Sequence, residues 1–308
     1  MNENIRPTPR LACVILAHAD PTHLRRLIEA LEPFPIFLHI DARTPDTTFA
    51  AMTADLPSRC TVLERTSTPW AQWGIVSAEL EGYRAALDAT DAAHIALLSG
   101  SDYPLASATE IADFLEEHSG ESFAKVNELP FALWGRSGGL ARLRYRHWAF
   151  GKRMLRLPVR RRLPQGITFT GGPTSKVLAR DHARAVVEVA AKHRGLVRFW
   201  RRSWSSDETF VYSVLNSPRF VPGWKKQLVR EDLWWIGWDG LRHKSPPWLD
   251  MTHRDFLLNR QKPGDPQFPV LFARKFSTER STPVLDAIDA RFGLRSHSLR
   301  GPEKLVQP

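Results

Sequence analysis

Residues 11–41, LACVILAHADPTHLRRLIEALEPFPIFLHID, contain two short apolar runs separated by an amphipathic stretch. The first run, 11–18, has the length and the β-branched residues of a buried strand. Asp20 is a favoured N-cap residue and Pro21 suits the first helical position, after which aliphatic residues recur at helical spacing. The second run, 35–41, has the same character as the first. A strand–helix–strand unit of about 30 residues predicts two parallel strands joined by a right-handed crossover.

The alternation of strand and helix patterns continues along most of the chain. Strands are expected at 61–64, 94–100 and 122–128, a strand turning into a helix at 176–193, and helices at 74–90, 108–120, 207–217 and within 281–308. Such alternation predicts an α/β fold with a mainly parallel, Rossmann-like central sheet flanked by helices. We expect an N-terminal tail at 1–9, a single domain at 10–280, and a C-terminal helix with a polar tail at 281–308.

The composition is that of a globular protein, since 43% of the 308 residues are hydrophobic and 25% are charged. No apolar run approaches the roughly 18 residues that a membrane-spanning helix needs. The start of the chain lacks the basic region, apolar core and cleavage site of a signal peptide. The two cysteines, Cys13 and Cys60, show no metal-binding spacing. Together these features predict a cytoplasmic protein.

The net charge of +10 favours an anionic partner. The charge is concentrated in residues 142–162, RLRYRHWAFGKRMLRLPVRRR, where nine arginines and lysines occur without an acid. Because apolar residues interleave with these cations, docking on anionic lipid or on a charged glycan is one interpretation, and a solvated basic face is the other. Nucleic acid is disfavoured, because no zinc-finger, basic-zipper or RNA-recognition signature is present. The predicted membrane or anion patch consists of Arg153, Arg156, Arg160, Arg161 and Arg162.

Polar residues follow three of the predicted strands. His18 follows the first strand, Asp41 the second, and Asp102 the strand within LLSGSDYPL (97–105). Ligands of an open parallel sheet bind in the crevice beyond the carboxyl ends of the strands, so these three side chains are candidates for ligand binding. The chain has no G-x-G-x-x-G after the first strand, no Walker loop and no G-x-S-x-G motif, so it lacks those phosphate cradles and that nucleophile.

Seven short segments occur in the order and spacing of a known family. They are ILAH (15–18), HLRRLIEAL (23–31), IFLHID (36–41), WAQWG (70–74), LLSGSDYPL (97–105), SDETF (206–210) and LFARKF (271–276). With these segments the chain resembles the core-2/I-branching glycosyltransferases, glycosyltransferase family 14, which include β-1,6-N-acetylglucosaminyltransferases and peptide O-xylosyltransferases. The resemblance covers roughly residues 10–280. It implies a GT-A fold, with a nucleotide-sugar-binding half at 10–130 and an acceptor and catalytic half at 131–280.

The resemblance also implies an activity: inverting, metal-independent transfer of GlcNAc or xylose from a UDP-sugar to a hydroxyl of a glycan or peptide. Most GT-A enzymes hold a metal ion on an Asp-x-Asp motif, and this chain contains no such motif. We therefore expect no cofactor and no metal site, with the UDP-sugar as co-substrate. The chain lacks the cysteines and the signal anchor of the animal members. This indicates a bacterial-type member that works in the cytoplasm or peripherally on the inner membrane.

Inverting transfer needs a base for the acceptor proton and positive charge beside the departing diphosphate. The resemblance puts the base at Glu208, with Asp207 orienting it or capping a helix. It puts diphosphate-binding cations at Lys275 and Arg254, with Arg274 as the alternative to either. The structural alternatives are an acid at a helix N-terminus and ordinary surface cations.

His18 and Asp41 are expected to bound the uridine pocket, since a carboxylate after the second strand of such a sheet commonly binds a ribose hydroxyl. Trp70 or Trp73 is expected to stack on the uracil or to line the donor site, although a tryptophan can equally pack in the core. The remaining candidates are Asp102 for the donor sugar or the acceptor, and Glu128 and Trp235 for the acceptor.

The chain departs from the family where Ser101 replaces a glutamine, where Ser206 replaces a proline, and where a tryptophan is missing after Gly172. The last departure leaves the acceptor open, and the choice between GlcNAc and xylose is open as well. A catalytically inactive, basic GT-A-like module that binds anionic lipid or nucleic acid is the competing function. The presence of both Glu208 and Lys275 argues against it. The missing paired carboxylates argue against a metal-dependent nucleotidyltransferase.

Overall fold

The computed structural model describes residues 10–150, 153–231, 233–237, 245–260 and 268–295. Its central sheet has the strand order β12-β6-β11-β4-β1-β2-β3. The strands are β1 (Leu11–Ala17), β2 (Ile36–Ile40), β3 (Cys60–Val62), β4 (His94–Ser99), β6 (Ser122–Phe123), β11 (Lys176–Ala179) and β12 (Leu228–Val229). Strands β4, β1, β2 and β3 are parallel to one another, whereas β11 is antiparallel to both of its neighbours. The predicted α/β fold with a mostly parallel sheet is therefore confirmed.

The first strand–helix–strand unit forms as the sequence predicts. Helix α1 (Pro21–Ala30) begins at Pro21, and the Asp20 carboxylate caps it by accepting a hydrogen bond from the His23 amide at 3.1 Å. The same carboxylate accepts hydrogen bonds from the amide and hydroxyl of Thr278 at 2.7 and 2.6 Å. Thr278 begins helix α11 (Thr278–Phe292), so one N-cap residue joins two helices that are distant in sequence.

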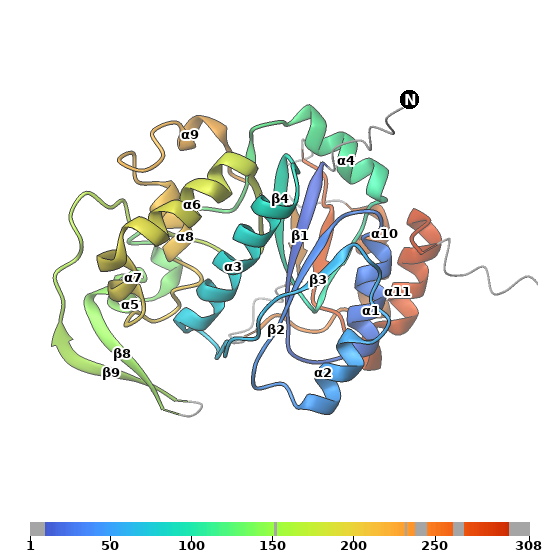
Figure 1. Cartoon of the computed structure of the whole chain (residues 1–308), viewed down its shortest axis with the longest axis horizontal. Coiled ribbons are helices and arrows are strands. Elements are labelled where there is room, and N and C mark those ends of the chain that lie inside the picture. The colour runs from blue at the N-terminus through green and yellow to red at the C-terminus, as the bar shows by residue number, and fades with distance from the viewer. Residues whose placement is uncertain (1–9, 151–152, 232, 238–244, 261–267, 296–308) are drawn as a thin grey trace, which may run out of the picture.

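Helices cover both faces of the central sheet (Figure 1). One face packs against α1, α4 (Ala108–Glu117), α10 (Arg254–Asn259) and α11, and the other against α3 (Trp73–Ala89), α6 (Arg180–Lys192) and α8 (Phe210–Leu215). Along β1, Cys13 and Ile15 belong to the first hydrophobic core, and Ala12 and Val14 belong to the second. A strand that is buried on both faces needs a continuous apolar run, which is what the sequence of β1 provides.

Smaller elements surround this framework. A three-stranded sheet contains β13 (Trp234–Ile236), β14 (Phe272–Arg274) and β5 (Asp102–Pro104), and a short pair contains β10 (Thr170–Gly171) and β7 (Asn127–Glu128). Strands β8 (Tyr145–Phe150) and β9 (Arg153–Arg160) form a separate hairpin. The remaining elements are α2 (Asp46–Thr53), α5 (Leu140–Arg144), α7 (Arg194–Trp200), α9 (Trp224–Gln227) and single 3₁₀ turns at Ala132–Trp134 and Met251–His253. Among the described residues, no helix has the length and hydropathy required to cross a bilayer.

Three predicted elements differ from the structure. The strand expected at 122–128 is divided between β6 and β7, which belong to different sheets. The helix expected at 207–217 begins only at Phe210, because residues 207–209 form a turn. The C-terminal helix begins at Thr278, so the expected boundary at 280 falls within its first turn.

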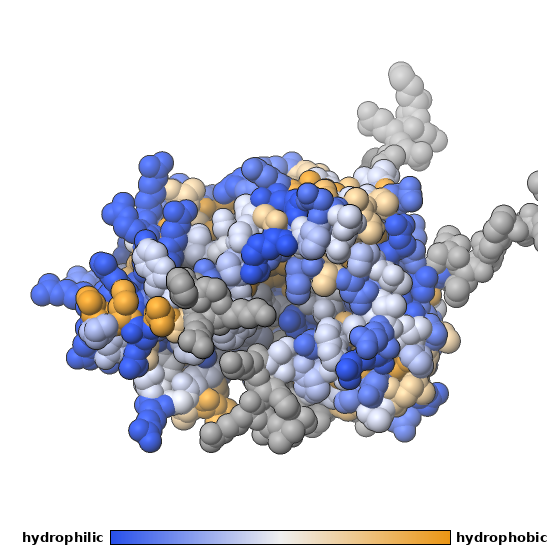
Figure 2. Space-filling model, turned by 90° about the horizontal axis from the view of Figure 1, so that it is seen from below, coloured by the Kyte–Doolittle hydropathy of each residue, from blue (hydrophilic) through white to orange (hydrophobic). Residues whose placement is uncertain are grey.

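The carboxyl ends of β1, β2 and β4 meet at one edge of the central sheet. Because the three strands are parallel, the residues that follow them emerge on the same side. Figure 2 views the molecule from this side, and its surface is hollowed near the middle. The fold thus presents the strand ends where the sequence predicts a ligand crevice.

A buried ion pair joins α3 to β11 beneath the second core. The Lys176 Nζ lies 2.8 Å from Glu79 Oε1, and both side chains are fully buried. The Tyr83 hydroxyl donates a second hydrogen bond to the same carboxylate oxygen at 2.8 Å. A buried pair of this kind is costly to break on one side, because the remaining charge stays in the core without its partner.

Replacing Lys176 by Met should lower the free energy of unfolding by about 3–5 kcal/mol, because it leaves Glu79 charged and unpaired. The double variant Glu79→Gln/Lys176→Met should recover most of this loss. Urea titrations followed by far-UV circular dichroism measure both values. The exposed pair of Lys192 and Glu188, with a 2.7 Å separation, is the control, and Lys192→Met should change nothing measurable. A double variant as unstable as the sum of its two single variants would contradict the argument.

Candidate functional site

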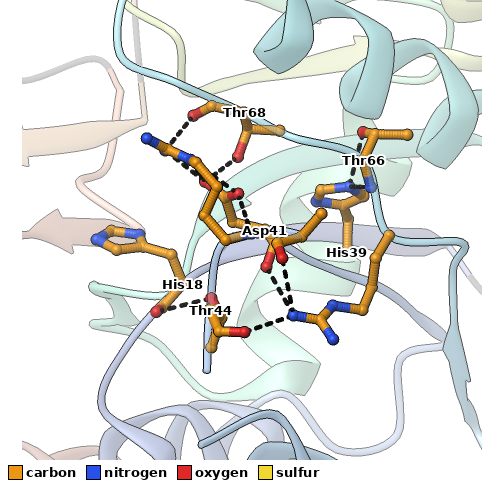
Figure 3. Close-up of polar contacts among 9 residues, drawn as sticks. His18, His39, Asp41, Thr44, Thr66 and Thr68 are labelled. Atoms are coloured by element: carbon orange, nitrogen blue, oxygen red, sulfur yellow. Dashed lines mark hydrogen bonds and ion pairs between the residues drawn. The ribbon is translucent and has the colours of Figure 1, made fainter. Parts of the chain in front are cut away.

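The ends of β1 and β2 bring His18 and Asp41 to the same place (Figure 3). Ala17 and Ile40 are paired in the parallel ladder, and the Asp41 amide donates to the Ala17 carbonyl at 2.9 Å. The Thr44 hydroxyl donates to the His18 carbonyl at 3.0 Å and holds the two loops together. The His18 side chain is exposed beside this contact. These two candidates are therefore neighbours at the carboxyl edge of the sheet.

The Asp41 carboxylate is buried and fixed in orientation. Arg43 donates to it from its backbone amide at 2.9 Å and from Nη2 at 2.6 Å, and the Thr68 hydroxyl donates at 2.8 Å. Burial alone would raise the pKa of Asp41, but the hydrogen bonds from Arg43 and Thr68 outweigh it and hold the pKa well below its ordinary value. The strand end therefore carries a permanently ionised acceptor for hydrogen bonds.

A second set of contacts fixes the loop that supplies Thr68. The Thr66 amide donates to His39 Nε2 at 3.0 Å, and Arg65 Nη2 donates to the Thr44 carbonyl at 2.5 Å. Burial lowers the pKa of His39, which keeps its ring neutral and able to accept this bond. The loop after β3 is thereby locked against the end of β2 (Figure 3).

Asp102 occupies a different kind of position. Its side chain is completely buried, and it accepts hydrogen bonds from Ser99 Oγ at 2.7 Å, from the Ser99 amide at 3.0 Å and from Trp234 Nε1 at 3.1 Å. Ser175 Oγ and Arg274 Nη1 lie 3.4 Å away. With its oxygens surrounded by protein donors, Asp102 contributes to the framework. Its expected contact with the donor sugar or the acceptor stays a prediction.

Lys275 lies at the end of β14, directly after the arginine that contacts Asp102. Its Nζ is 4.1 Å from the centre of the Trp248 ring and donates to Ser245 Oγ at 2.9 Å. Partial burial, together with the neighbouring charge of Arg274, lowers the pKa of Lys275 from its ordinary value. A lysine held over an indole in this way is oriented before any ligand arrives.

Trp235 belongs to β13 of the same three-stranded sheet, and Arg254 begins the helix that packs beside it. Arg254 begins α10, is exposed, and pairs with Asp255 at 3.2 Å. The Trp235 ring is half-buried and stacks on Phe256 of the same helix, with the ring centres 4.2 Å apart. Trp235 is therefore engaged in packing, whereas the Arg254 guanidinium is accessible.

Glu208 projects from the turn between α7 and α8, and about a third of its side chain is exposed. Arg142 of α5 forms an ion pair with its carboxylate. The Arg142 guanidinium lies between two indoles, with its Cζ 4.3 Å from the centre of the Trp134 ring and 5.2 Å from that of Trp204. These contacts hold the arginine, and the arginine in turn orients the Glu208 carboxylate.

The segment at 171–175 connects the surroundings of Glu208 to those of Asp102. The Gly172 amide donates to the Glu208 carbonyl at 2.9 Å, and the Ser175 hydroxyl contacts Asp102. A Cβ on Gly172 would lie 2.1 Å from the Lys125 carbonyl oxygen, so only glycine fits there. Glu208 and the sheet that carries Lys275 are therefore linked by a continuous set of contacts.

Asp207, the neighbour of Glu208, points into the protein. It is buried, accepts a hydrogen bond from the Thr174 hydroxyl at 3.2 Å, and has no partner for Oδ1 among the described residues. Burial, together with the charge of Glu208, raises the pKa of Asp207 to about 7. The adjacent acids thus occupy different environments, and only Glu208 reaches solvent.

The tryptophans at 70–74 lie beside the Glu208 turn. Trp70 is 60% exposed and is 6.4 Å from the Trp204 ring, whereas Trp73 is half-buried with its edge against Phe210. Trp73 also lines a cleft of about 630 Å³ between the start of α3, the β8–β9 hairpin and α7. Trp70 is therefore the more accessible of the two for stacking on a ring.

Glu128 lies on β7, opposite Thr170 in the short pair with β10. It is exposed and pairs with Lys225 at 3.2 Å. Its neighbour Asn127 is paired with Gly171, so Glu128 lies close to the segment that contacts Glu208. It remains an accessible candidate for contact with an acceptor.

The predicted arginine patch is not uniform. Arg156, Arg160 and Arg162 are exposed. Arg161 is not part of this surface, because its guanidinium donates to the Phe199 carbonyl at 2.7 Å, the Leu143 carbonyl at 2.5 Å and Ser203 Oγ at 2.8 Å. Burial and the charge of Arg146 lower the pKa of Arg161 to about 10. The side chain of Arg153 lies outside the described part of the chain.

Several residues at this site are not predicted as site residues from the sequence. The sequence places Arg142 in the basic segment, yet its side chain pairs with Glu208. Its contacts with Trp134 and Trp204 correspond to no periodic pattern in the sequence. Arg43 could have been found, since an arginine two residues after a strand-end aspartate is within reach of its carboxylate. No group of three or more potential metal ligands occurs among the residues that the structure describes.

Comparison with known proteins identifies relatives of the chain. The sequence model of the Core-2/I-Branching enzyme family matches residues 12–257. Xylosyltransferase 2 of Rattus norvegicus and of Canis lupus familiaris are each 25% identical over 311 aligned residues, which cover 92% of this chain and 34% of the relative. The chain therefore spans about a third of the length of these relatives.

One similar solved structure is HddC from Yersinia pseudotuberculosis. It is 12% identical, and the alignment covers 56% of this chain and 78% of HddC with a TM-score of 0.29. A likeness this low carries no argument about the fold or the function.

The buried Asp207 predicts a pH dependence of stability. Its pKa in the folded protein, about 7, is above that of an exposed carboxyl, so folding retains a proton that the unfolded chain releases. Stability should therefore fall as the pH rises from about 4 to 7. In Asp207→Asn this loss should disappear. The free energy of unfolding of the variant should therefore rise by up to about 4 kcal/mol relative to that of the wild type over that range.

Urea titrations at pH 4, 5.5, 7 and 8 measure the free energy of unfolding of both proteins. The difference between them should grow from about zero to several kcal/mol as the pH rises. Asp181→Asn is the matched control, because its carboxylate is 88% exposed. A stability difference that stays constant with pH would contradict the assignment of a protonated Asp207.

Proposed function

The chain belongs to the Core-2/I-branching enzyme family, and from this premise we propose that it is an inverting glycosyltransferase with a GT-A fold. The donor is UDP-GlcNAc or UDP-xylose, and the acceptor is a hydroxyl of a glycan or peptide. Family membership supports transfer of a sugar, and the mostly parallel sheet with helices on both faces supports the proposed fold. The observation that carries the mechanism is the solvent-accessible Glu208 carboxylate, oriented by Arg142.

In this mechanism Glu208 is the general base. It accepts the proton of the acceptor hydroxyl as the oxygen attacks the anomeric carbon, and the bond from that carbon to the diphosphate oxygen breaks on the opposite side. The configuration is inverted because the reaction is one in-line displacement. The Arg142 contact positions the carboxylate, and the buried Asp207 is directed away from solvent. Glu208 is thus the acid of the pair that is placed to act.

The departing UDP requires positive charge, and we propose that Lys275 and Arg254 supply it in place of a metal ion. Lys275 is oriented over Trp248, and Arg254 is accessible at the start of a neighbouring helix. Arg274 is held towards Asp102, which makes it a less suitable substitute for either cation. The absence of an Asp-x-Asp motif in the sequence supports this metal-independent scheme.

Asp41 and His18 are proposed to bind the nucleoside. The ionised and fixed Asp41 carboxylate suits a ribose hydroxyl, and the exposed His18 lies beside it. Trp70 offers an accessible ring for the uracil or the sugar, and Trp73 is held against Phe210 near the same turn. Glu128 and Trp235 are proposed to contact the acceptor; Glu128 is exposed, and Trp235 is half-buried against Phe256 of α10.

Glu208→Gln should reduce release of UDP by about 10²–10⁴-fold, because the amide no longer accepts the hydroxyl proton. The measurement is UDP release from a panel of UDP-sugars in excess EDTA, with slow transfer to water as the background reaction. Binding of UDP, seen as a rise in melting temperature, should be retained. Glu188→Gln, which changes an exposed glutamate on α6, is the control and should leave both values unchanged.

Two results would contradict the proposal. If UDP failed to shift the melting temperature of the wild type and no donor released UDP, the inactive binding module would be the better interpretation. If EDTA abolished release, the transferase would stand but the metal-free stabilisation by Lys275 and Arg254 would be wrong.

Lys275→Ala should lower kcat by about 10²–10³-fold, since it removes a cation from the developing diphosphate charge. Lys275→Arg should retain more activity than Lys275→Ala because it keeps the charge. Steady-state kinetics with the donor identified above provide the measurement. Lys192→Ala, which removes an exposed lysine on α6, is the control. Equal loss in the alanine and arginine variants would show that the packing of Lys275, not its charge, matters.

A further inference from the structure

The β8–β9 hairpin projects from the body of the protein (Figure 1). It forms its own two-stranded antiparallel sheet, and Trp148 is paired with Leu155 across it. Its base is fastened by Arg161, which donates to backbone carbonyls of α5 and α7. The hairpin is therefore a fixed element of the fold with two accessible faces.

One face of this hairpin carries exposed hydrophobic side chains. Leu155, Leu157 and Val159 alternate along β9 and so lie on one face, and they are 50%, 38% and 54% exposed. Trp148, opposite Leu155, is 52% exposed. We call these four residues the hairpin strip. Isolated exposed hydrophobic residues are ordinary, but four on one face of a projecting hairpin form a patch of the kind that marks an interaction site.

Arginines lie on the same hairpin and beside it. Arg156 and Arg160 alternate with the strip residues along β9 and so lie on its other face, and Arg162 follows the strand; all three are exposed. A second group lies across the adjoining cleft, on and after α7, and consists of Arg198, Arg201 and Arg202, all of them exposed. The Arg202 guanidinium lies 4.5 Å from the centre of the Trp148 ring. The surface thus combines aliphatic and indole side chains with positive charge.

The combination of exposed apolar side chains and arginines favours one class of partner over the others. A second copy of the chain would bring two basic segments together, each of which has no acid within 142–162. Nucleic acid would neutralise the arginines but would leave the aliphatic residues of the hairpin strip exposed to water. An anionic bilayer accommodates both, since apolar side chains enter the interface while arginines remain at the headgroups.

We propose that the β8–β9 hairpin docks the protein on an anionic membrane surface, with the hairpin strip inserted between headgroups and the neighbouring arginines bound to phosphates. Figure 2 shows hydrophobic residues gathered on the hairpin, at the left, in the same view as the edge where the strands end. Docking in this way turns the candidate site towards the bilayer. The proposal rests on the hairpin alone and does not depend on the proposed sugar transfer.

Sedimentation of the full chain with vesicles tests this docking. The protein should bind vesicles of phosphatidylcholine with phosphatidylglycerol, bind phosphatidylcholine alone at least about tenfold more weakly, and lose affinity at high salt. The triple variant Leu155→Ser/Leu157→Ser/Val159→Ser should bind the anionic vesicles about tenfold more weakly. It should keep the wild-type melting temperature and UDP release, because these side chains are exposed and lie outside the candidate site.

Leu133→Ser is the matched control, since Leu133 is 84% exposed on a different element. It should bind vesicles as the wild type does. The charge variant Arg156→Gln/Arg160→Gln/Arg162→Gln should lose the preference for phosphatidylglycerol.

Three outcomes would overturn the proposal. The first is equal vesicle binding by the wild type and the serine variant, which would reduce the effect to adsorption of a basic protein. The second is the absence of vesicle binding. The third is a concentration-dependent dimer that the serine variant abolishes while vesicles are not bound, which would assign the hairpin strip to a second copy of the chain.

Discussion

The buried Asp102 carboxylate joins the two sheets on which the candidate site is built. It accepts hydrogen bonds from Ser99 at the end of β4 and from Trp234 on β13, and it contacts Ser175 before β11 and Arg274 on β14. A carboxylate without water is stable in a protein only when such donors surround it. These donors come from four segments that are far apart in the sequence. Their contacts with one carboxylate hold the four segments together.

This arrangement connects segments from both halves of the chain. Asp41 and His18 come from the ends of the parallel strands, whereas Lys275 comes from the smaller sheet that Asp102 attaches. Glu208 is linked to the same network through the glycine-containing segment at 171–175. The residues proposed to bind the donor and to act as cations and base are thus supported by connected elements, which favours a precise arrangement of reacting groups.

The arginines of the segment at 142–162 have separate roles that the net charge conceals. Arg142 lies between two indoles and orients Glu208, and Arg161 fastens the hairpin through backbone carbonyls. Arg156, Arg160 and Arg162 remain at the surface. Each guanidinium has the same chemistry, so its surroundings decide whether it orients a carboxylate, stabilises a loop or meets an external anion.

Local sequence patterns are sufficient to predict the elements whose stability is local. The strand at 11–18, the helix capped by Asp20 and the strand at 35–41 were predicted because their apolar periodicity and capping residues are properties of adjacent positions. The placement of His18 and Asp41 at strand ends followed from the same pattern. The family segments also located Glu208 and Lys275, although their roles remain proposals.

The contacts between distant segments depend on the tertiary structure. It buried the Asp102 side chain, divided the strand expected at 122–128, and turned Arg142 and Arg161 inward. Burial of a charged group depends on donors that arrive from other parts of the chain, and no local pattern records them. The local sequence therefore specified which strands and helices form, while long-range hydrogen bonding and packing decided which of their polar residues face the solvent.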